Sequence, residues 1–381
     1  MQARRSAVPL RHTTLITSIT CCALMLAGAC SSSHPSGGTG SGKPAATSAA
    51  AFGGMDALVA AAKKEGKINV IALPPNWANY GKIINDFQKK YGIQVVSSQP
   101  DASSQQEINT AKQLAGTDRA PDVFDLGQNV VLANTGMFAP YQVQTWQGIP
   151  SQLKDPSGLW TSDYGGYMSI GYDAAKVPAP TSVQDLLKPA YRGKVTLEGD
   201  PTQAAAGFYG VVAASLGSGG SPDNIAPGVN FFATLHKEGN FLPITPTPAT
   251  IESGQTPVVF NWDYLNAATT AQFAGKIDWK VVVPKNAVVG SYYAQAINKN
   301  AVHPAAARLW QEYLFSDEGQ NSFLEGFARP VRADTMQKAG TLDMAALAKL
   351  PPRAGTPVFL TPQQLAAASE YLSKHWASAI G

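Results

Sequence analysis

One segment, Asn76-Trp77-Ala78-Asn79-Tyr80, most constrains what this chain can fold into. The apolar run at residues 68–73 before it has the composition of a buried strand. An amphipathic helix after it is indicated by apolar residues on one face, at Ile83, Ile84, Phe87 and Tyr91. Trp77 and Tyr80 therefore lie at the carboxyl end of a strand, where ligands collect in open α/β sheets. Spacing alone favours plain packing, with Trp77 filling the strand–helix corner, but two later aromatic groups shift the balance towards a site.

Strands and helices alternate through the first half of the chain. Strands are predicted at 92–96 and 121–126, with a polar helix at 105–114 between them. Asn129 follows the third strand and is a candidate site residue for that reason. This alternation predicts βαβ units and a mostly parallel sheet.

An extended aromatic run at 159–172 is predicted to form two strands or one long crossing strand. Beyond it, Asp200 and Pro201 are interpreted as the cap and first residue of an Ala-rich helix. A second block is predicted with strands at 194–198, 256–260, 279–283 and 291–297, and helices at 182–187, from 200, at 224–237 and from 304 onward. Because the chain has 381 residues, the two blocks predict an α/β protein with two lobes and a cleft between them.

The amino terminus has the pattern of an export signal. Arg4, Arg5 and Arg11 precede an apolar stretch that is short for a spanning helix of about 20 residues. The end of this stretch, Leu26-Ala27-Gly28-Ala29-Cys30, resembles a bacterial lipoprotein signal. That resemblance implies cleavage before Cys30 and a lipid that anchors the exported protein to the outer face of the cell membrane. The alternative is an ordinary secretory signal with an incidental cysteine.

The predicted domain boundaries follow from these patterns. Residues after Cys30, up to about 54, are rich in Ser, Gly, Pro, Thr and Ala, which is the composition of a flexible linker. We predict a signal peptide at 1–29, the lipidated cysteine and linker at 30–54, lobe 1 at 55–160 with 290–335, and lobe 2 at 161–289 with 336–381, including the C-terminal helices.

Charge and motif content exclude several classes of function. The formal net charge of +3 disappears without the three N-terminal arginines, because 26 of the 29 basic residues then balance 26 acidic ones. No basic surface for nucleic acid is expected. We find no nucleophile beside a base and no metal-ligand spacing of His and Cys. We therefore expect a monomeric binding protein with no cofactor and no enzymatic activity.

The chain from about residue 56 to 334 resembles the extracellular solute-binding proteins of bacterial ABC importers, in the group with polyamine, ferric-ion, thiamine and phosphonate receptors. The landmarks are residues 76–80, 121–124, 164–172, 185–194, 298–307, 316–320 and 329–332. The resemblance implies a type II periplasmic-binding-protein fold. It also implies that a small solute is captured by hinge closure and delivered to a membrane permease and its ATPase subunit. A ligand-sensing lipoprotein without a transport role is the alternative.

Resemblance to polyamine receptors suggests an aromatic box for an organic cation. Trp77 and Tyr80 match the pair after the first strand, and Trp262-Asp263 resembles a later Trp-Asx step. Such boxes hold ammonium groups by cation–π contact and charge. Asp200 and Asp263 are the candidate counter-charges. Asn79 stands where an acidic residue is expected, so a singly charged or zwitterionic ligand is an equal alternative.

Two other ligand classes remain open. Iron receptors of the group use a Tyr-Tyr pair, and Tyr292-Tyr293 is such a pair, although it falls one strand later than in the family. A strand with one ring in the core and one outward also explains that pair. An anion such as an aminoethylphosphonate could use the amides at the helix start after Asp200, with Arg329 and Arg332 as possible partners that we expect to be solvated.

Overall fold

The computed structural model describes residues 46–352 and 355–381, which belong to one compact unit. The predicted signal peptide and the lipidation site at Cys30 lie outside the described residues. Among the described residues, no helix is long and apolar enough to span a bilayer.

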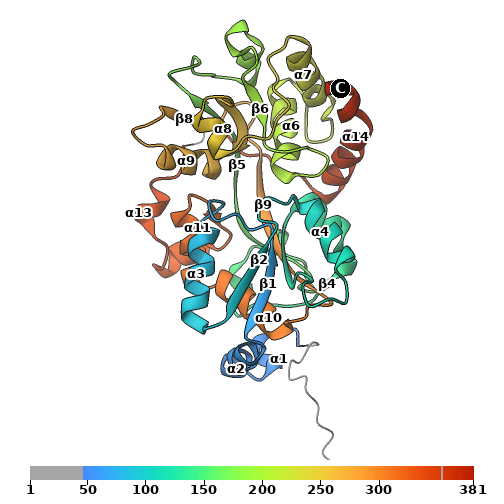
Figure 1. Cartoon of the computed structure of the whole chain (residues 1–381), viewed down its shortest axis with the longest axis vertical. Helices are drawn as coiled ribbons and strands as arrows, with labels where there is room; N and C mark the ends of the chain where they lie inside the picture. Colours follow the sequence, from blue (N-terminus) through green and yellow to red (C-terminus); the bar gives the residue numbers. More distant parts are fainter. Residues whose placement is uncertain (1–45, 353–354) are drawn as a thin grey trace, which may run out of the picture. The chain divides into compact units, whose positions relative to one another are not determined.

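The predicted first strand and helix are confirmed. β1 (Lys67–Ile71) pairs in parallel with β2 (Gln94–Ser98), and α3 (Tyr80–Tyr91) connects them. α3 buries Tyr80, Ile83 and Phe87. These side chains lie on one face because their spacing follows the helical repeat. α10 (Pro304–Leu314) packs against α2 (Met55–Glu65) beside this pair of strands (Figure 1).

The aromatic run at 159–172 is one long strand, β5 (Thr161–Asp173), which is the second of the two predicted alternatives. Its first half pairs with β9 (Gly290–Asn298), and its second half pairs with β7 (Val258–Trp262) and β8 (Trp279–Val282). β9 lies between β5 and β3 (Val123–Gly127), which pairs with its other edge. β5 and β9 thus run between two groups of elements, as Figure 1 shows.

The expectation of a mostly parallel sheet is wrong. Only β1 with β2 and β6 (Val195–Leu197) with β7 are parallel pairs among the described strands. β5 and β9 pair antiparallel to each other and to their other neighbours. The reason is that both strands cross from one α/β group to the other, so they run against the strands that the helical crossovers place in parallel.

Helices cover the second group of strands. α6 (Ala205–Gly217) is buried on nearly every face and packs against α7 (Ala226–Lys237), which α14 (Pro362–Ile380) covers in turn. Besides α1 and short 3-10 turns, the described chain also contains α4 (Ser104–Gln113), α5 (Gln128–Ala133), β4 (Phe138–Ala139), α8 (Pro248–Glu252), α9 (Asp263–Gln272), α11 (Asp317–Glu325), β10 (Arg329–Pro330), α12 (Ala333–Ala339) and α13 (Met344–Leu347).

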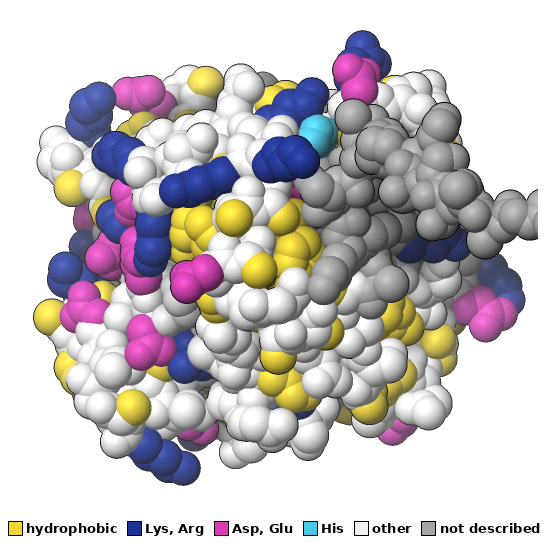
Figure 2. All heavy atoms as spheres, turned by 90° about the horizontal axis from the view of Figure 1, so that it is seen from below, with side chains coloured by type: hydrophobic (Ala, Val, Ile, Leu, Met, Phe, Trp, Pro, Cys, Tyr) yellow, Lys and Arg dark blue, Asp and Glu magenta, His cyan; other side chains and the backbone are white. Residues whose placement is uncertain are grey.

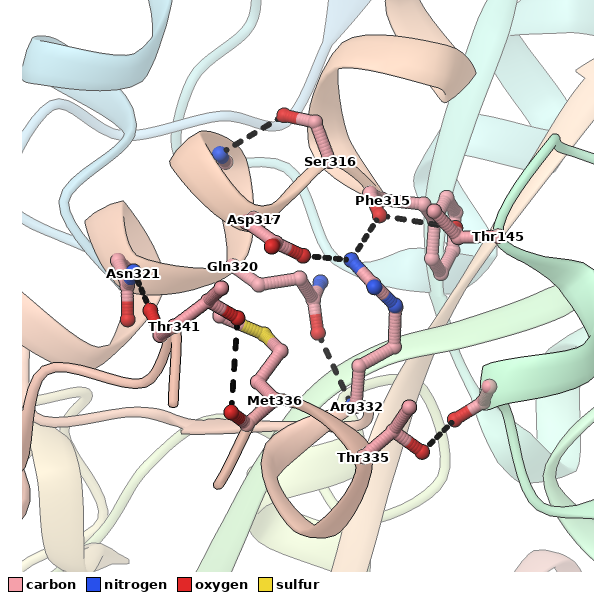
Figure 3. A network of polar contacts seen from close by, with 12 residues as sticks. Thr145, Phe315, Ser316, Asp317, Gln320, Asn321, Arg332, Thr335, Met336 and Thr341 are labelled. Atoms are coloured by element: carbon pink, nitrogen blue, oxygen red, sulfur yellow. Dashed lines mark hydrogen bonds and ion pairs between the residues drawn. The ribbon is translucent and has the colours of Figure 1, made fainter. Parts of the chain in front are cut away.

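Arg332 is buried, not solvated as expected (Figure 3). Its Nη1 donates to the carbonyl oxygen of Phe315 at 2.7 Å and pairs with Asp317 at 2.8 Å. Its backbone N–H donates to Oε1 of Gln320 at 3.1 Å. Arg332 therefore ties the residue before α12 to the start of α11, because a buried guanidinium needs several acceptors.

The predicted linker ends before residue 54. α1 (Ala49–Phe52) forms behind the N-cap Ser48, and Phe52 is buried in the core. Nε of Arg308 donates to the carbonyl oxygen of Ala46 at 2.8 Å. Small, polar composition suggested a linker, but Phe52 and the partner Arg308, more than 250 residues away in the chain, provide burial that composition does not reveal.

Candidate ligand-binding site

A cavity of about 450 Å³ lies where the carboxyl ends of several strands meet. Its wall includes Ala72 after β1, Pro100 to Ser104 after β2, Asp125 in β3, and Glu198 to Asp200 after β6. α8 and α9 and the start of α6 complete the wall. The volume is within the range of about 300–1,000 Å³ that is usual for small-molecule sites.

A cluster of five aromatic rings borders this cavity. The ring of Trp77 lies 5.6 Å from that of Tyr293 and 6.2 Å from that of Tyr264, both edge to face. Tyr293 stacks on Tyr164 at 5.5 Å, and Trp262 stacks on Tyr264 at 6.3 Å. Trp77 and Tyr293 belong to the cavity wall. Their rings can attract a cation, because the faces of aromatic rings carry negative charge density.

A chain of hydrogen bonds joins Trp77 to a buried carboxyl group. Nε1 of Trp77 donates to the hydroxyl oxygen of Tyr164 at 2.9 Å, and that hydroxyl donates to Oδ2 of Asp125 at 2.8 Å. Asp125 is 4% exposed, and its Oδ1 has no hydrogen-bond partner within the described residues. Burial raises the pKa of the Asp125 carboxyl to about 7, although hydrogen bonds from its neighbours oppose the increase.

Two further carboxyl groups in the wall are perturbed in the same direction. Glu107 in α4 accepts the backbone N–H of Asp125 at 3.1 Å. Burial raises the pKa of Glu107 well above its usual range, and the nearby charge of Asp125 adds to this increase. Glu198 accepts Nδ2 of Asn261 at 2.9 Å, and burial raises the pKa of Glu198 to about 8. Such shifts mark carboxylates that lack a counter-charge.

All charged side chains of the cavity wall are acidic. Asp101 and Asp200 are exposed at its edge and join Asp125, Glu107 and Glu198. No Lys, Arg or His of the described chain belongs to the wall, whereas the outer face in Figure 2 displays many Lys and Arg side chains. The arrangement favours a solute that brings positive charge into the cavity.

Asp200 lies in the cavity wall but does not cap α6. Its Oδ1 accepts the backbone N–H of Thr202 at 2.8 Å and the hydroxyl of Thr202 at 2.7 Å. α6 begins at Ala205, with Ala204 as an N-cap that has no side-chain hydrogen bond. The predicted cap is therefore wrong: Asp200 stabilises a separate turn, and the helix begins four residues later than the Asp-Pro step suggested.

The structure brings three of the eight candidate ligand-binding residues into the cavity wall, namely Trp77, Asp200 and Tyr293. Tyr80 is fully buried beneath them, where it accepts Nε2 of Gln295 at 3.0 Å. Trp262 is 1% exposed within the aromatic cluster. These two side chains support the wall from behind without belonging to it.

Asp263 faces a cation of the protein itself. Its carboxylate is fully buried, pairs with Nη1 of Arg329 at 2.5 Å, and accepts the backbone N–H of Tyr167 at 2.9 Å. Arg329 is 18% exposed and lies over the ring of Tyr167 at 4.5 Å, so the expectation of a solvated arginine is wrong here too. The protein thus provides the counter-charge that we had expected from a ligand.

Asn129 and Tyr292 also lie outside the cavity wall. Oδ1 of Asn129 is buried without a hydrogen-bond partner. Tyr292 stacks on Phe359 at 6.3 Å, while its neighbour Tyr293 faces the aromatic cluster. Successive side chains of a strand point to opposite faces, so the two tyrosines cannot act as one pair. Within residues 46–352 and 355–381, no group of three or more His, Cys, Asp or Glu could hold a metal ion.

Sequence reasoning did not find three carboxyl residues of the cavity, the buried Glu107 and Asp125 and the half-buried Glu198. A signal existed for two of them. Asp125 interrupts an apolar strand, and Glu198 directly follows one. Glu107 had none, because a glutamate in a polar helix looks solvated until the helix packs on β3.

The fold and this cavity define a two-lobed type II periplasmic-binding-protein-like architecture, as the resemblance implied. Residues 118–351, more than half of the chain, match the family of bacterial extracellular solute-binding proteins. The chain belongs to this family, whose members are small-molecule receptors of ABC importers. Comparison with curated proteins gave no significant match.

Solved structures support the fold. AgtB from A. tumefaciens R10, in complex with agropinic acid, matches with a TM-score of 0.65 and 13% identity over 83% of this chain and 98% of AgtB. Iron-bound HitA from Pseudomonas aeruginosa matches with a TM-score of 0.60 and 21% identity, over 82% of this chain and 99% of HitA. AfuA from Actinobacillus pleuropneumoniae, with fructose-6-phosphate bound, matches with a TM-score of 0.60 and 17% identity, over 82% of this chain and 97% of AfuA. At these identities the likeness shows the fold alone.

Proposed function

We propose that this protein captures an organic cation, of the polyamine or related amine class, for import across the cell membrane. The observation that carries the proposal is the cavity wall, which combines five carboxyl groups with the rings of Trp77 and Tyr293 and includes no basic side chain from the described part of the chain. Carboxylates and aromatic faces together stabilise ammonium groups. Binding, without any chemical change of the solute, is the function that we assign.

Hinge closure is the proposed means of capture. β5 and β9 are the strands that connect the two groups of elements, so they are the natural hinge. We keep lobe 1 at 55–160 with 290–335 and lobe 2 at 161–289 with 336–381 as a proposal. Asp125 of the proposed lobe 1 and Glu198 of the proposed lobe 2 both line the cavity. A cation that contacts both favours the closed form, because only differential contact shifts the equilibrium.

Delivery completes the proposal. The closed receptor presents its solute to an ABC permease, while the lipid expected on Cys30 keeps the protein at the outer face of the membrane. One lipid chain gives only marginal binding to a bilayer, so a lipoprotein anchor with several chains is the form that fits.

A zwitterionic amine is the second candidate, favoured by one specific observation. The start of α6, with its uncapped amides, belongs to the cavity wall beside Glu198 and Asp200. Helix N-termini attract anionic groups. A solute such as aminoethylphosphonate could place its phosphonate there and its ammonium near the carboxylates.

Thermal unfolding of the chain from residue 31, which contains the whole compact unit, tests these alternatives. The panel comprises putrescine, spermidine, thiamine, aminoethylphosphonate, ferric citrate and simple sugars. A ligand at a hundred times its dissociation constant stabilises by about 2.7 kcal/mol, which gives a measurable shift. A shift with amines alone supports the first candidate, and a shift with aminoethylphosphonate alone supports the second. A shift only with iron or a sugar contradicts both.

A further inference from the structure

One buried oxygen atom of Asp125, a residue of the cavity wall, has no hydrogen-bond partner among the described residues. Asp125 is 4% exposed, and Tyr164 occupies its Oδ2 by donating a hydrogen bond at 2.8 Å. Oδ1 accepts no hydrogen bond. A buried carboxyl oxygen without a donor lowers stability, and a partner from outside the protein, such as a bound ion, is one explanation of such an atom.

The described neighbours of Asp125 bring no positive charge to it. α4 contributes Glu107 and α3 contributes Tyr80, while β5 contributes Asp163 and Tyr164. β9 contributes Gln295, whose Nε2 already donates to Tyr80 and to Oδ2 of Asp163, each at 3.0 Å. These groups are acidic or neutral, so the elements packed around Asp125 bring no cation to it.

Aromatic rings alone would not distinguish among cations. Trp77 and Tyr293 in the cavity wall attract an ammonium group whether or not it carries hydrogen atoms, because cation–π attraction depends on charge. An unpaired carboxylate oxygen is different, because it gains most from a donor that also carries charge.

We propose that Asp125 is the specificity-determining acceptor of this cavity, and that the captured cation is a protonated amine with at least one N–H rather than a quaternary ammonium ion. This inference rests on the proposed function and narrows it. The N–H donates to Oδ1 while the rings of Trp77 and Tyr293 lie beside the charge. A quaternary ion places methyl groups against Oδ1 and leaves it unpaired.

The size of the preference follows from the kind of bond that is lost. A hydrogen bond between charged groups is worth roughly a ten- to hundredfold change in affinity. We expect putrescine to bind at least tenfold more tightly than 1,4-bis(trimethylammonium)butane. N,N′-dimethylputrescine, which is larger than putrescine but keeps its N–H groups, should remain within about fivefold of putrescine.

Isothermal titration of the chain from residue 31 with these three diamines, and with ethanolamine against choline, tests the inference. If the quaternary ions bind as tightly as the matched amines, the inference is overturned while the proposed function stands. If no cation in the set binds, the proposed function fails and the inference fails with it.

Asp125→Asn provides a second, independent test. The amide keeps an oxygen for Tyr164 to donate to, but it removes the charge and the free carboxylate oxygen. We expect a ten- to hundredfold loss of affinity for whichever amine binds the parent. Asp278→Asn is the matched control, because that aspartate is exposed and paired only with Lys280. Unchanged amine binding in a folded Asp125→Asn variant would show that Asp125 is not the acceptor.

Discussion

The indole of Trp77 and the phenol of Tyr164 are joined by a hydrogen bond of 2.9 Å from Nε1 to the hydroxyl oxygen. Trp77 follows β1, whereas Tyr164 belongs to β5, the strand that crosses between the two groups of elements. The hydroxyl of Tyr164 in turn donates a hydrogen bond to Oδ2 of Asp125. A solute that touches Trp77 or Asp125 therefore contacts a hydrogen-bond partner of Tyr164, which is a residue of the proposed hinge.

Tyr164→Phe tests how much this chain of hydrogen bonds contributes to the free energy of unfolding. The substitution leaves Oδ2 of Asp125 without its donor and Nε1 of Trp77 without its acceptor. We expect a loss of about 1–3 kcal/mol in the free energy of unfolding, measured with urea. Tyr91→Phe is the control, because the Tyr91 hydroxyl has no comparable bond. Equal effects of the two substitutions would contradict the assigned role.

Affinity for an amine should depend on pH in a defined direction. The carboxyls of Asp125 and Glu198 have pKa values of about 7 and about 8 because they are buried. A bound cation favours their ionised forms, so binding below pH 8 must release protons. We expect affinity to rise from pH 6 to pH 8, by up to about tenfold per pH unit for each proton released. Titration calorimetry in buffers of different ionisation enthalpy measures the release, and pH-independent affinity would argue against both carboxyls.

The stability of the empty protein should show the opposite dependence. Because burial raises the pKa of Asp125 above its unfolded value, its contribution to stability is retained below about pH 4 and lost as the pH rises through about 7. In Asp125→Asn the side chain cannot ionise, so the variant does not lose stability as the pH rises through about 7. We expect the variant to be more stable than the parent at pH 8, by about 2–4 kcal/mol, and the difference to vanish near pH 4. Urea denaturation without ligand at both pH values checks this, and a variant less stable at pH 8 would refute it.

Arg329→Met should destabilise the fold strongly. Asp263 is fully buried, and Arg329 is its partner at 2.5 Å. Removing one member of a buried ion pair costs about 3–5 kcal/mol because the other charge is left unpaired. Lys276→Met breaks an exposed pair with Glu252 and should cost about 1 kcal/mol or less. Thermal unfolding of the two variants compares them, and similar losses would mean that Asp263 does not depend on Arg329.

The sequence by itself determined most of the elements. The apolar strand near residue 68 and the amphipathic face of Ile83 and Phe87 follow from local periodicity, which depends on neighbours only a few residues apart. The run near Tyr164 was predicted to be extended, and strand pairing decided that it is one strand and not two. The family resemblance rested on the same local segments and predicted the two-lobed fold.

Only the tertiary structure decided which residues meet at the cavity. Asp125 and Glu198 are 73 positions apart, and their common environment arises because β3 and β6 end at one place. The tertiary structure also pairs Asp263 with Arg329, so the carboxylate of Asp263 is not available as a counter-charge for a bound cation. Local periodicity predicts which face a side chain occupies, but its charge partners depend on strand pairings that span most of the chain.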